Sequence, residues 1–183
     1  MNLLTSYISR YNTVSVSQKI DKIKKKFFIW YIMNLEEYLA SKKNIPKQVK
    51  KLIEIQNNEF NNILNELIYF NKKISHWAWW VFPTEIMGSH DPLKTCVPKV
   101  YKLKYLYIIN KFNIINQWIE ILNKIIDLIK NKKHIINKII PTADHYRIKP
   151  YFFDFWLTDD VRISYEKFYD TVNILKNEWS KYI

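Results

Sequence analysis

The sequence predicts an all-α, or very nearly all-α, single-domain fold, and its glycine content is the clearest reason. Glycine occurs once in 183 residues, at Gly88, whereas average usage of about 7% would give about a dozen. Turns that need positive φ must therefore be rare, as must the dipeptides typical of hairpins. Apolar residues also recur at helical spacing over most of the chain. We expect a bundle-like fold with one long, ordered loop, rich in Pro and Trp, at 71–98.

The spacing of apolar residues defines the expected elements. Residues 1–17 are polar and have no clear period, which predicts a partly ordered N-terminal arm, and the helical domain spans 18–183. The expected helices of this domain are 18–40, 46–70, a stretch marked by Val100, Leu103 and Tyr107, then 112–130, and a final helix from Asp159 onward. The helix at 46–70 carries an i, i+3, i+4, i+7 stripe, so we place it in the core with 112–130.

The loop at 71–98 differs in composition from the rest of the chain. It contains three of the seven tryptophans, two of the four histidines and the only glycine. Its tryptophans would bury a large area only if they were held in place, so we expect an ordered but largely irregular segment.

The charge of the chain favours an anionic partner. Lys and Arg number 29 and Asp and Glu number 17, which gives a formal net charge of +12. This charge suits nucleic acid, a phosphate-bearing small molecule or an acidic membrane surface. The excess of basic residues also has a second explanation. Lys, Asn and Ile have A/T-rich codons, so their abundance would reflect an A/T-rich genome, such as a viral or parasitic one.

The composition excludes several kinds of site. One glycine cannot build a Walker A loop or a dinucleotide fingerprint. Cys96 is the only cysteine, so neither an intrachain disulfide nor a cysteine-rich zinc site can form within the chain. The histidines show no metal-binding spacing, and we expect no metal and no cofactor. No run of about 18 apolar residues occurs, which predicts a cytoplasmic protein without integral membrane association and leaves the oligomeric state open.

The strongest candidate site lies at 72–83. Lys73, Ser75, His76, Trp77 and Trp79 combine positive charge, a hydroxyl, a ring that titrates near neutral pH and stacking surfaces. This combination suits a pocket for a base or a sugar phosphate. The alternative is structural: the tryptophans are core residues, the histidine bonds to a backbone carbonyl and the lysines are solvated.

The same region resembles a known family of small bacterial proteins. The residues that carry the resemblance lie within about 56–88 and are Gln56, Phe60, Leu64, Glu66, Leu67, Lys73, Ser75, His76, Trp77, Trp79, Phe82 and Pro83. In this spacing they resemble the family known as domain of unknown function eighteen-ten, some members of which are labelled calpastatin. Thr84 and Glu85 depart from its pattern, and its later blocks are not found in 99–183. The resemblance implies a mostly helical single domain with a ligand pocket near His76, and it implies no particular reaction.

A second candidate site surrounds Gly88. As the only residue without a Cβ, Gly88 suggests a turn with positive φ or a close approach of backbone. The polar residues around it are Thr84, Glu85, His90, Asp91, Lys94 and Thr95. Asp91 or Glu85 would serve with His76 as acid and base, and the others would contact a phosphate or its neighbourhood. The alternative is an Asp-Pro turn with an exposed histidine.

A third candidate is Arg147, in the run Asp144-His145-Tyr146-Arg147. A guanidinium can bind a phosphate or carboxylate with two parallel hydrogen bonds, and Asp144 would then orient His145. The alternative is that Asp144 caps a helix and pairs with Arg147 three residues on.

Three functions from different classes fit these observations. The leading hypothesis is binding of a nucleotide-like or phosphate-bearing ligand, RNA and DNA included, at residues 73–95 and Arg147. The second is a hydrolase or transferase that acts on a nucleotide or nucleic acid, with His76 and either Asp91 or Glu85 in acid–base roles. The third is a structural or interaction protein without catalysis, in which all the aromatic residues are core.

Overall fold

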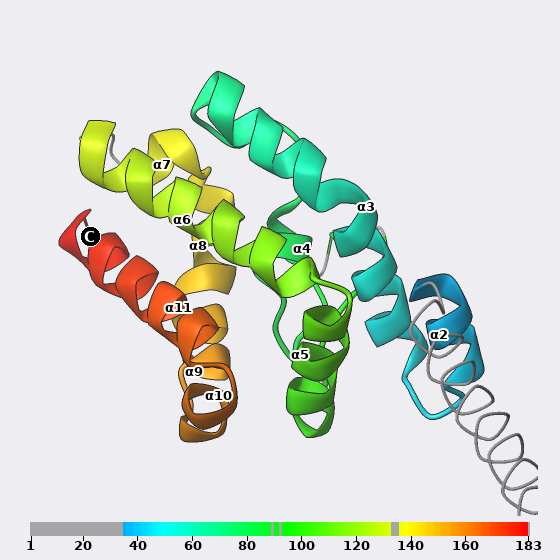
Figure 1. Cartoon of the computed structure of the whole chain (residues 1–183). Helices are drawn as coiled ribbons and strands as arrows, with labels where there is room; N and C mark the ends of the chain where they lie inside the picture. The colour runs from blue at the N-terminus through cyan, green and yellow to red at the C-terminus, as the bar shows by residue number, and fades with distance from the viewer. Residues whose placement is uncertain (1–34, 89, 92, 133–135, 183) are drawn as a thin grey trace, which may run out of the picture. The chain divides into compact units, whose positions relative to one another are not determined.

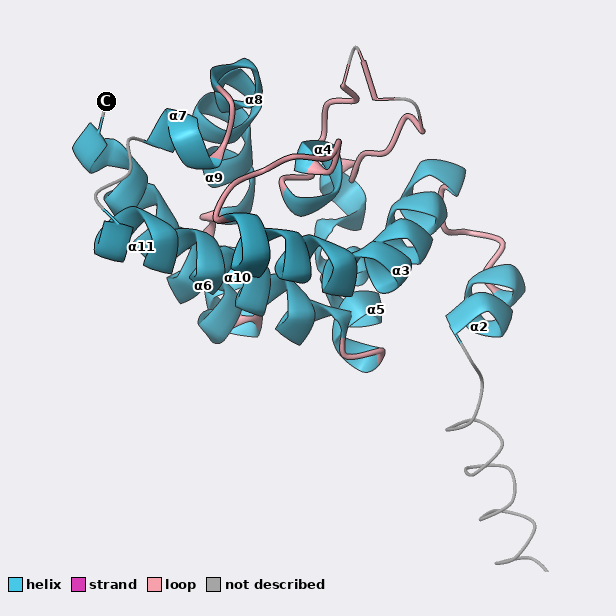
Figure 2. Cartoon of the chain, turned by 90° about the horizontal axis from the view of Figure 1, so that it is seen from above, coloured by secondary structure: helices cyan, strands magenta, loops and turns pink. Residues whose placement is uncertain are grey.

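The computed structural model describes residues 35–182 except 89, 92 and 133–135. These residues form helices joined by loops (Figure 1). Figure 2 shows the same chain coloured by secondary structure, with no strand in the part described. The prediction of an all-α fold is confirmed.

Contacts group the chain into two compact units, residues 1–42 and 43–183. Helix α2, Leu35–Ser41, is the described part of the first unit. The expected arm at 1–17 lies outside the described residues, as does most of the expected helix at 18–40. All the candidate site residues belong to the second unit.

Three long helices form the centre of the second unit. They are α3 (Lys47–Phe70), α6 (Ile114–Lys132) and α11 (Glu166–Trp179). Helix α6 packs against both of the others and lies between them in Figure 1. Helix α3 begins directly after Pro46 and is followed by Asn71, which is left-handed and whose N–H bonds to the Leu67 carbonyl. The predicted core helices at 46–70 and 112–130 are both confirmed.

Aromatic rings fill the core around Trp118 of α6. Its ring centroid lies 4.4 Å from that of Phe168 and 5.4 Å from that of Trp156. Tyr105 and Phe152 contact it as well, in edge-to-face arrangements. Such pairs add to the stability that burial of the rings already provides.

The described residues of 71–98 form a loop interrupted by one short helix, α4 (Ala78–Val81). A helix of one turn leaves most of its carbonyls without partners inside the helix. Here each carbonyl of residues 80–83 accepts a 2.8 Å hydrogen bond from a side chain of another element: Gln56 to Trp80, Trp118 to Val81, Arg147 to Phe82 and Trp156 to Pro83. These four bonds explain why a segment with so little regular structure holds one conformation.

Helix α5 (Lys102–Lys111) follows a 3-10 turn at Lys99–Tyr101 and confirms the predicted third helix. The stripe that marked it in the sequence is nevertheless on the solvent side, since Val100 is 87% exposed. The buried face is formed by other residues: Lys102, Tyr105, Leu106, Ile108 and Ile109. The apolar residues of α5 occupy both faces, so spacing alone could not identify the inner one.

The C-terminal third is more helical than the sequence suggested. Helices α7 (Ile136–Ile139), α8 (Thr142–Arg147) and α9 (Phe153–Trp156) occur there, and a π-helical turn at Ile148–Phe152 joins α8 to α9. The predicted final helix is two helices, α10 (Asp159–Ser164) and α11, because Tyr165 leaves the helical conformation with φ −145° and ψ 55°.

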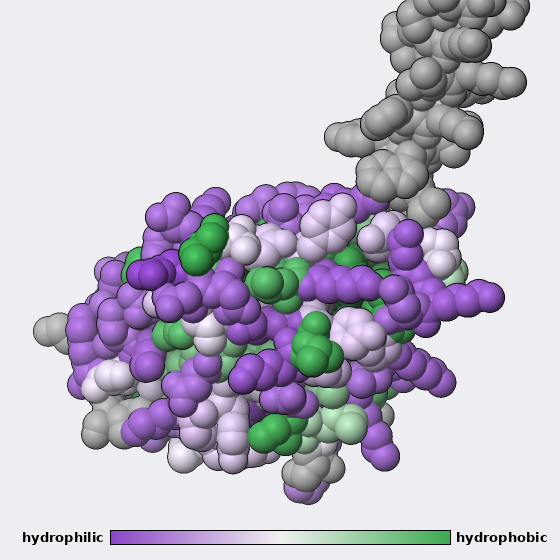
Figure 3. Space-filling view, turned by 90° about the horizontal axis from the view of Figure 1, so that it is seen from below, coloured by the Kyte–Doolittle hydropathy of each residue, from purple (hydrophilic) through white to green (hydrophobic). Residues whose placement is uncertain are grey.

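The surface mixes hydrophilic and hydrophobic side chains. On the face drawn in Figure 3, green hydrophobic groups lie scattered among purple hydrophilic ones. Among the described helices, none combines the length and apolar character needed to cross a membrane.

Candidate functional site

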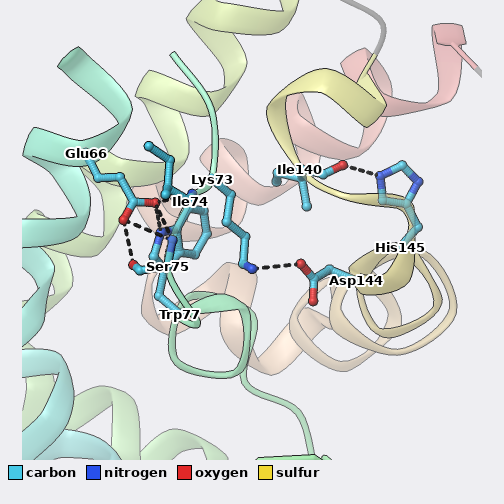
Figure 4. A network of polar contacts seen from close by, with 8 residues as sticks. All are labelled: Glu66, Lys73, Ile74, Ser75, Trp77, Ile140, Asp144 and His145. Atoms are coloured by element: carbon cyan, nitrogen blue, oxygen red, sulfur yellow. Dashed lines mark hydrogen bonds and ion pairs between the residues drawn. The ribbon is translucent and has the colours of Figure 1, made fainter. Parts of the chain in front are cut away.

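Glu66, near the end of α3, binds the start of the 71–98 loop (Figure 4). Its carboxylate accepts hydrogen bonds from the N–H of Ile74 at 2.7 Å and from the N–H and hydroxyl of Ser75 at 3.2 and 2.5 Å. The indole N–H of Trp77 donates to the same carboxylate at 2.6 Å. Ser75 and Trp77, expected at a ligand pocket, are therefore engaged in this network, and the Trp77 ring is fully buried.

These hydrogen bonds also set the ionisation of Glu66. Partial burial on its own raises the pKa of the carboxyl group, but the bonds from Ile74, Ser75 and Trp77 together outweigh it. The pKa of Glu66 therefore lies below its ordinary range, because hydrogen bonds to the charged form favour that form.

Lys73 connects the same loop to α8. Its ammonium lies 3.1 Å from a carboxylate oxygen of Asp144 and 5.7 Å from the centre of the Trp77 ring, and its backbone N–H donates to Ile139. Asp144 thus pairs with Lys73 and not with Arg147, and Pro141 precedes the first residue of α8, so the expected cap is wrong. Figure 4 shows His145 turned away from Asp144, with its ring 2.9 Å from the Ile140 carbonyl.

His76 lies exposed beside this network and lines neither of the cavities described below. Among the described residues, no hydrogen bond or ion pair joins it to Asp91 or Glu85. The structure therefore does not assemble the acid–base group that the sequence suggested.

Asp91 and Thr95 form a buried turn. The Asp91 carboxylate accepts bonds from the N–H of Leu93 at 3.0 Å and from the N–H and hydroxyl of Thr95 at 2.6 and 2.7 Å. Both side chains are buried and mutually engaged, as in the structural alternative of an Asp-led turn. His90 and Lys94 are exposed on either side, and Lys94 has a positive φ of 49°.

Arg147, at the end of α8, is a buried cation. Only 3% of the residue is exposed. Its Nε donates to the Phe82 carbonyl at 2.8 Å and its Nη1 to the Ile86 carbonyl at 3.1 Å. Its Nη2 is buried with no hydrogen-bond partner, and none of the described carboxylates forms an ion pair with it.

Burial lowers the pKa of Arg147 to about 10, and the negative charge of Asp91 opposes this effect. The guanidinium is therefore charged near neutral pH. A buried charge without a direct ion pair is unfavourable, because Asp91 offsets only part of its desolvation.

Trp79 positions Arg147. The guanidinium carbon lies 4.1 Å from the centre of the Trp79 ring, and the ring meets Tyr146 edge-on with centroids 6.3 Å apart. Gly88 packs on the same ring so closely that an added Cβ would lie 2.3 Å from it. The only glycine therefore serves a close approach, and its φ is not positive. With its ring in contact with the guanidinium, Trp79 holds Arg147 in place.

A cavity of about 220 Å³ opens beside this group, and we name it the Arg147 cavity. It is lined by Trp79, Thr84, Ile86, Met87, Gly88, Tyr146, Arg147 and Tyr151. Arg147 is the charged residue of this lining, and no carboxylate belongs to it. Tyr146, Arg147 and Tyr151 come from α8 and the π-helical turn, and π-helical turns are frequent at functional sites.

A second cavity, of about 230 Å³, adjoins the first, and we name it the Lys102 cavity. Its lining is Thr84, Glu85, Ile86, Lys99, Lys102, Pro150, Tyr151, Asp154, Phe155 and Thr158. Three residues, Thr84, Ile86 and Tyr151, belong to both linings. The Lys102 ammonium is already bound to the Thr158 hydroxyl at 2.6 Å and to Asp160 at 3.1 Å.

The structure thus divides the candidates from the sequence into three groups, one of which, His76, His90 and Lys94, is exposed and lines neither cavity. Trp79, Glu85 and Arg147 line cavities, whereas Lys73, Ser75, Trp77, Asp91 and Thr95 are engaged in internal contacts. Sequence reasoning missed Tyr146 and Tyr151 as lining residues. For Tyr151 the available signal was its position four residues after Arg147, since residues four apart in a helix share a face. No such spacing marked Tyr146, which is adjacent to Arg147.

Cys96 is buried and unpaired, and burial raises the pKa of its thiol. Over the described residues, no group of three or more His, Cys, Asp or Glu side chains is placed to hold a metal ion. Comparisons of the chain with protein-family models, with curated proteins and with solved structures found no match.

Proposed function

We propose that the chain binds a nucleotide-like, phosphate-bearing ligand and that its phosphate lies in the Arg147 cavity. The observation that supports this most is Arg147 itself, which is buried, charged near neutral pH and without an ion-pair partner among the described residues. A phosphate supplies both the direct ion pair that Arg147 lacks and acceptors for the guanidinium, and such charge-assisted bonds are among the strongest in proteins.

The rest of the lining suits the same ligand. Tyr146 and Tyr151 place phenol rings at the Arg147 cavity, and both residues are about half exposed, at 52% and 44%. A phenol hydroxyl can donate to a phosphate oxygen, and its ring can pack on an apolar part of a ligand. No carboxylate lines this cavity to repel an anion.

The resemblance to the eighteen-ten family enters this proposal as an account of how the site is held. Three residues that carry the resemblance, Glu66, Ser75 and Trp77, form the network at the start of the loop. A fourth, Phe82, receives Arg147 through its carbonyl. We infer that the residues shared with this family maintain the loop that places Trp79 and Gly88 at the Arg147 cavity. Trp79 follows His76 by three residues, so this cavity lies near the position at which the resemblance implies a pocket.

The proposal is for binding, and a reaction is not part of it. The hydrolase or transferase hypothesis needs His76 beside a carboxylate, and Asp91 is committed to Thr95 while Glu85 lies at the other cavity. A ligand held by Arg147 does not depend on either contact.

The test is calorimetric titration of the full chain with AMP, adenosine and inorganic phosphate. We expect AMP to bind, adenosine to bind at least tenfold more weakly, and Arg147→Met to remove AMP binding, because loss of a charge-assisted contact costs about one decade or more in affinity. His76→Ala is the matched control and should leave the affinity within about twofold.

Arg147 also bonds to two backbone carbonyls, so Arg147→Met can weaken the fold. Tyr151→Ala changes a half-exposed lining residue instead and should lower AMP affinity without lowering the melting temperature. Absence of AMP and phosphate binding to the folded wild-type chain, or binding that neither variant alters, would refute the proposal.

A further inference from the structure

The Lys102 cavity differs from the Arg147 cavity in its chemistry. Two carboxylates, Glu85 and Asp154, line it together with two ammonium groups, Lys99 and Lys102. The two cavities share three lining residues and so lie next to each other, which puts the second within reach of a group attached to a phosphate at Arg147. What the second cavity can bind therefore bears on what is attached to the phosphate.

The carboxylates of this cavity are weakly engaged. Glu85 accepts a long bond of 3.4 Å from the Lys99 N–H, and the ion pair of Asp154 with Lys176 spans 3.9 Å. An ionised carboxylate only accepts hydrogen bonds, so each can take a further donor from a ligand. The hydroxyl groups of a sugar are donors of this kind.

The Lys102 ammonium and the hydroxyls of Thr84 and Thr158 are, by contrast, already engaged. The Lys102 ammonium bonds to Thr158 and Asp160, and Thr84 bonds to the backbone of Ile86 through its hydroxyl. The polar groups that remain for a ligand are therefore the two carboxylates, the exposed Lys99 and the hydroxyl of Tyr151, which the two cavities share.

Apolar surfaces complete the lining. Pro150, Tyr151 and Phe155 contribute two rings and a pyrrolidine to the cavity. Flat apolar surfaces of this kind pack against the C–H face of a sugar or against a base. Carboxylate acceptors beside such surfaces suit a ring that bears hydroxyl groups.

We propose that the Lys102 cavity is a ribose subsite, in which Glu85 and Asp154 accept hydrogen bonds from the sugar hydroxyls of a ribonucleotide. This inference rests on the proposed function, because it takes the phosphate at Arg147 as its anchor. It names the ligand class as ribonucleotides and distinguishes them from deoxyribonucleotides, which lack one of the donors.

The experiment compares AMP, 2′-deoxy-AMP, 3′-deoxy-AMP and inorganic phosphate by calorimetric titration of the full chain. AMP should bind about tenfold more tightly than at least one of the deoxy forms, since an unmatched hydrogen bond to a charged group costs about that factor. Glu85→Gln and Asp154→Asn should each reduce this ratio toward one and leave phosphate affinity unchanged. Asp170→Asn, an exposed residue of α11 outside the lining, is the matched control and should retain the ratio.

The possible results separate the two proposals. If AMP and both deoxy forms bind equally and Arg147→Met still removes binding, the ribose subsite is refuted and the phosphate site stands. If the ratio survives in Glu85→Gln and in Asp154→Asn, the subsite as assigned is refuted as well. If neither AMP nor phosphate binds, the proposed function fails and the subsite fails with it.

Discussion

Glu66 is the residue on which the start of the 71–98 loop depends. Four donors converge on its carboxylate, from Ile74, Ser75 and Trp77. One of them is the indole of a fully buried tryptophan, so the carboxylate orients a core ring as well as a turn. A neutral amide cannot accept all of these bonds, since its nitrogen is a donor.

Glu66→Gln should therefore lower stability and flatten its dependence on acid. The pKa of Glu66 is lower in the folded chain than its ordinary value of about 4.3, so its contribution is full above that pH and is lost as the pH falls through the folded pKa. We expect a loss of about 1–3 kcal/mol at neutral pH and a shallower decline below about pH 4.5.

Urea denaturation at a series of pH values measures both effects. Glu54→Gln, on the exposed side of the same helix, is the control and should change neither. A Glu66→Gln chain that keeps the full acid dependence of the wild type would show that other carboxylates cause it.

The sequence predicted the site at the level of single residues only in part. Arg147 and Trp79 were selected for charge and aromatic surface, and both lie at a cavity. Asp91 and Thr95 were selected for the same kind of reason, yet they bond to each other. Residue type indicates what a side chain can bind, but the fold determines which partner it meets. Arg147, for example, bonds to the carbonyl of Phe82, which lies 65 positions away in the sequence.

Helix α5 shows how the same limit acts on an element. Its existence followed from composition, but it carries apolar residues on two faces, and the stripe that includes Leu103 is the outer one. Leu106, one turn further on, is fully buried. In the segment 141–156 the sequence pattern instead failed to predict a helix. Pro150 indicated a break, but the chain stays helical there because Pro150 lies in a π-helical turn.

Two leucine substitutions on α5 test this orientation. Leu106→Ala should cost about 2–5 kcal/mol, because it leaves a cavity in the core. Leu103→Ala, which is the same chemical change on the outer face, should cost less than about 1 kcal/mol. Chemical denaturation of both variants measures the difference, and equal losses would mean that the buried face of α5 has been misassigned.

The whole molecule carries a charge of +12, which acts on any anion and does not depend on one cavity. The positive charge provides a second way to bind nucleic acid, because Lys and Arg side chains on the surface displace counterions from the phosphate backbone. Binding through many surface charges and binding at Arg147 therefore differ in their response to salt.

Titration of a labelled RNA oligonucleotide at two salt concentrations separates these routes. Affinity for the RNA should fall by more than tenfold between about 50 and 200 mM salt, whereas affinity for AMP, which has few charges, should fall much less. Arg147→Met should leave RNA affinity within about twofold. An RNA affinity that disappears with Arg147→Met would instead assign the polynucleotide to the cavity.

The contact between Gly88 and the Trp79 ring has a genetic consequence. Every other amino acid has a Cβ, and a Cβ at this position would lie 2.3 Å from the ring that carries Arg147. Each missense change in this codon therefore displaces the indole and, through it, the guanidinium. The chain's single glycine codon is thus a position at which selection for the cavity would act on every amino-acid replacement, conservative ones included.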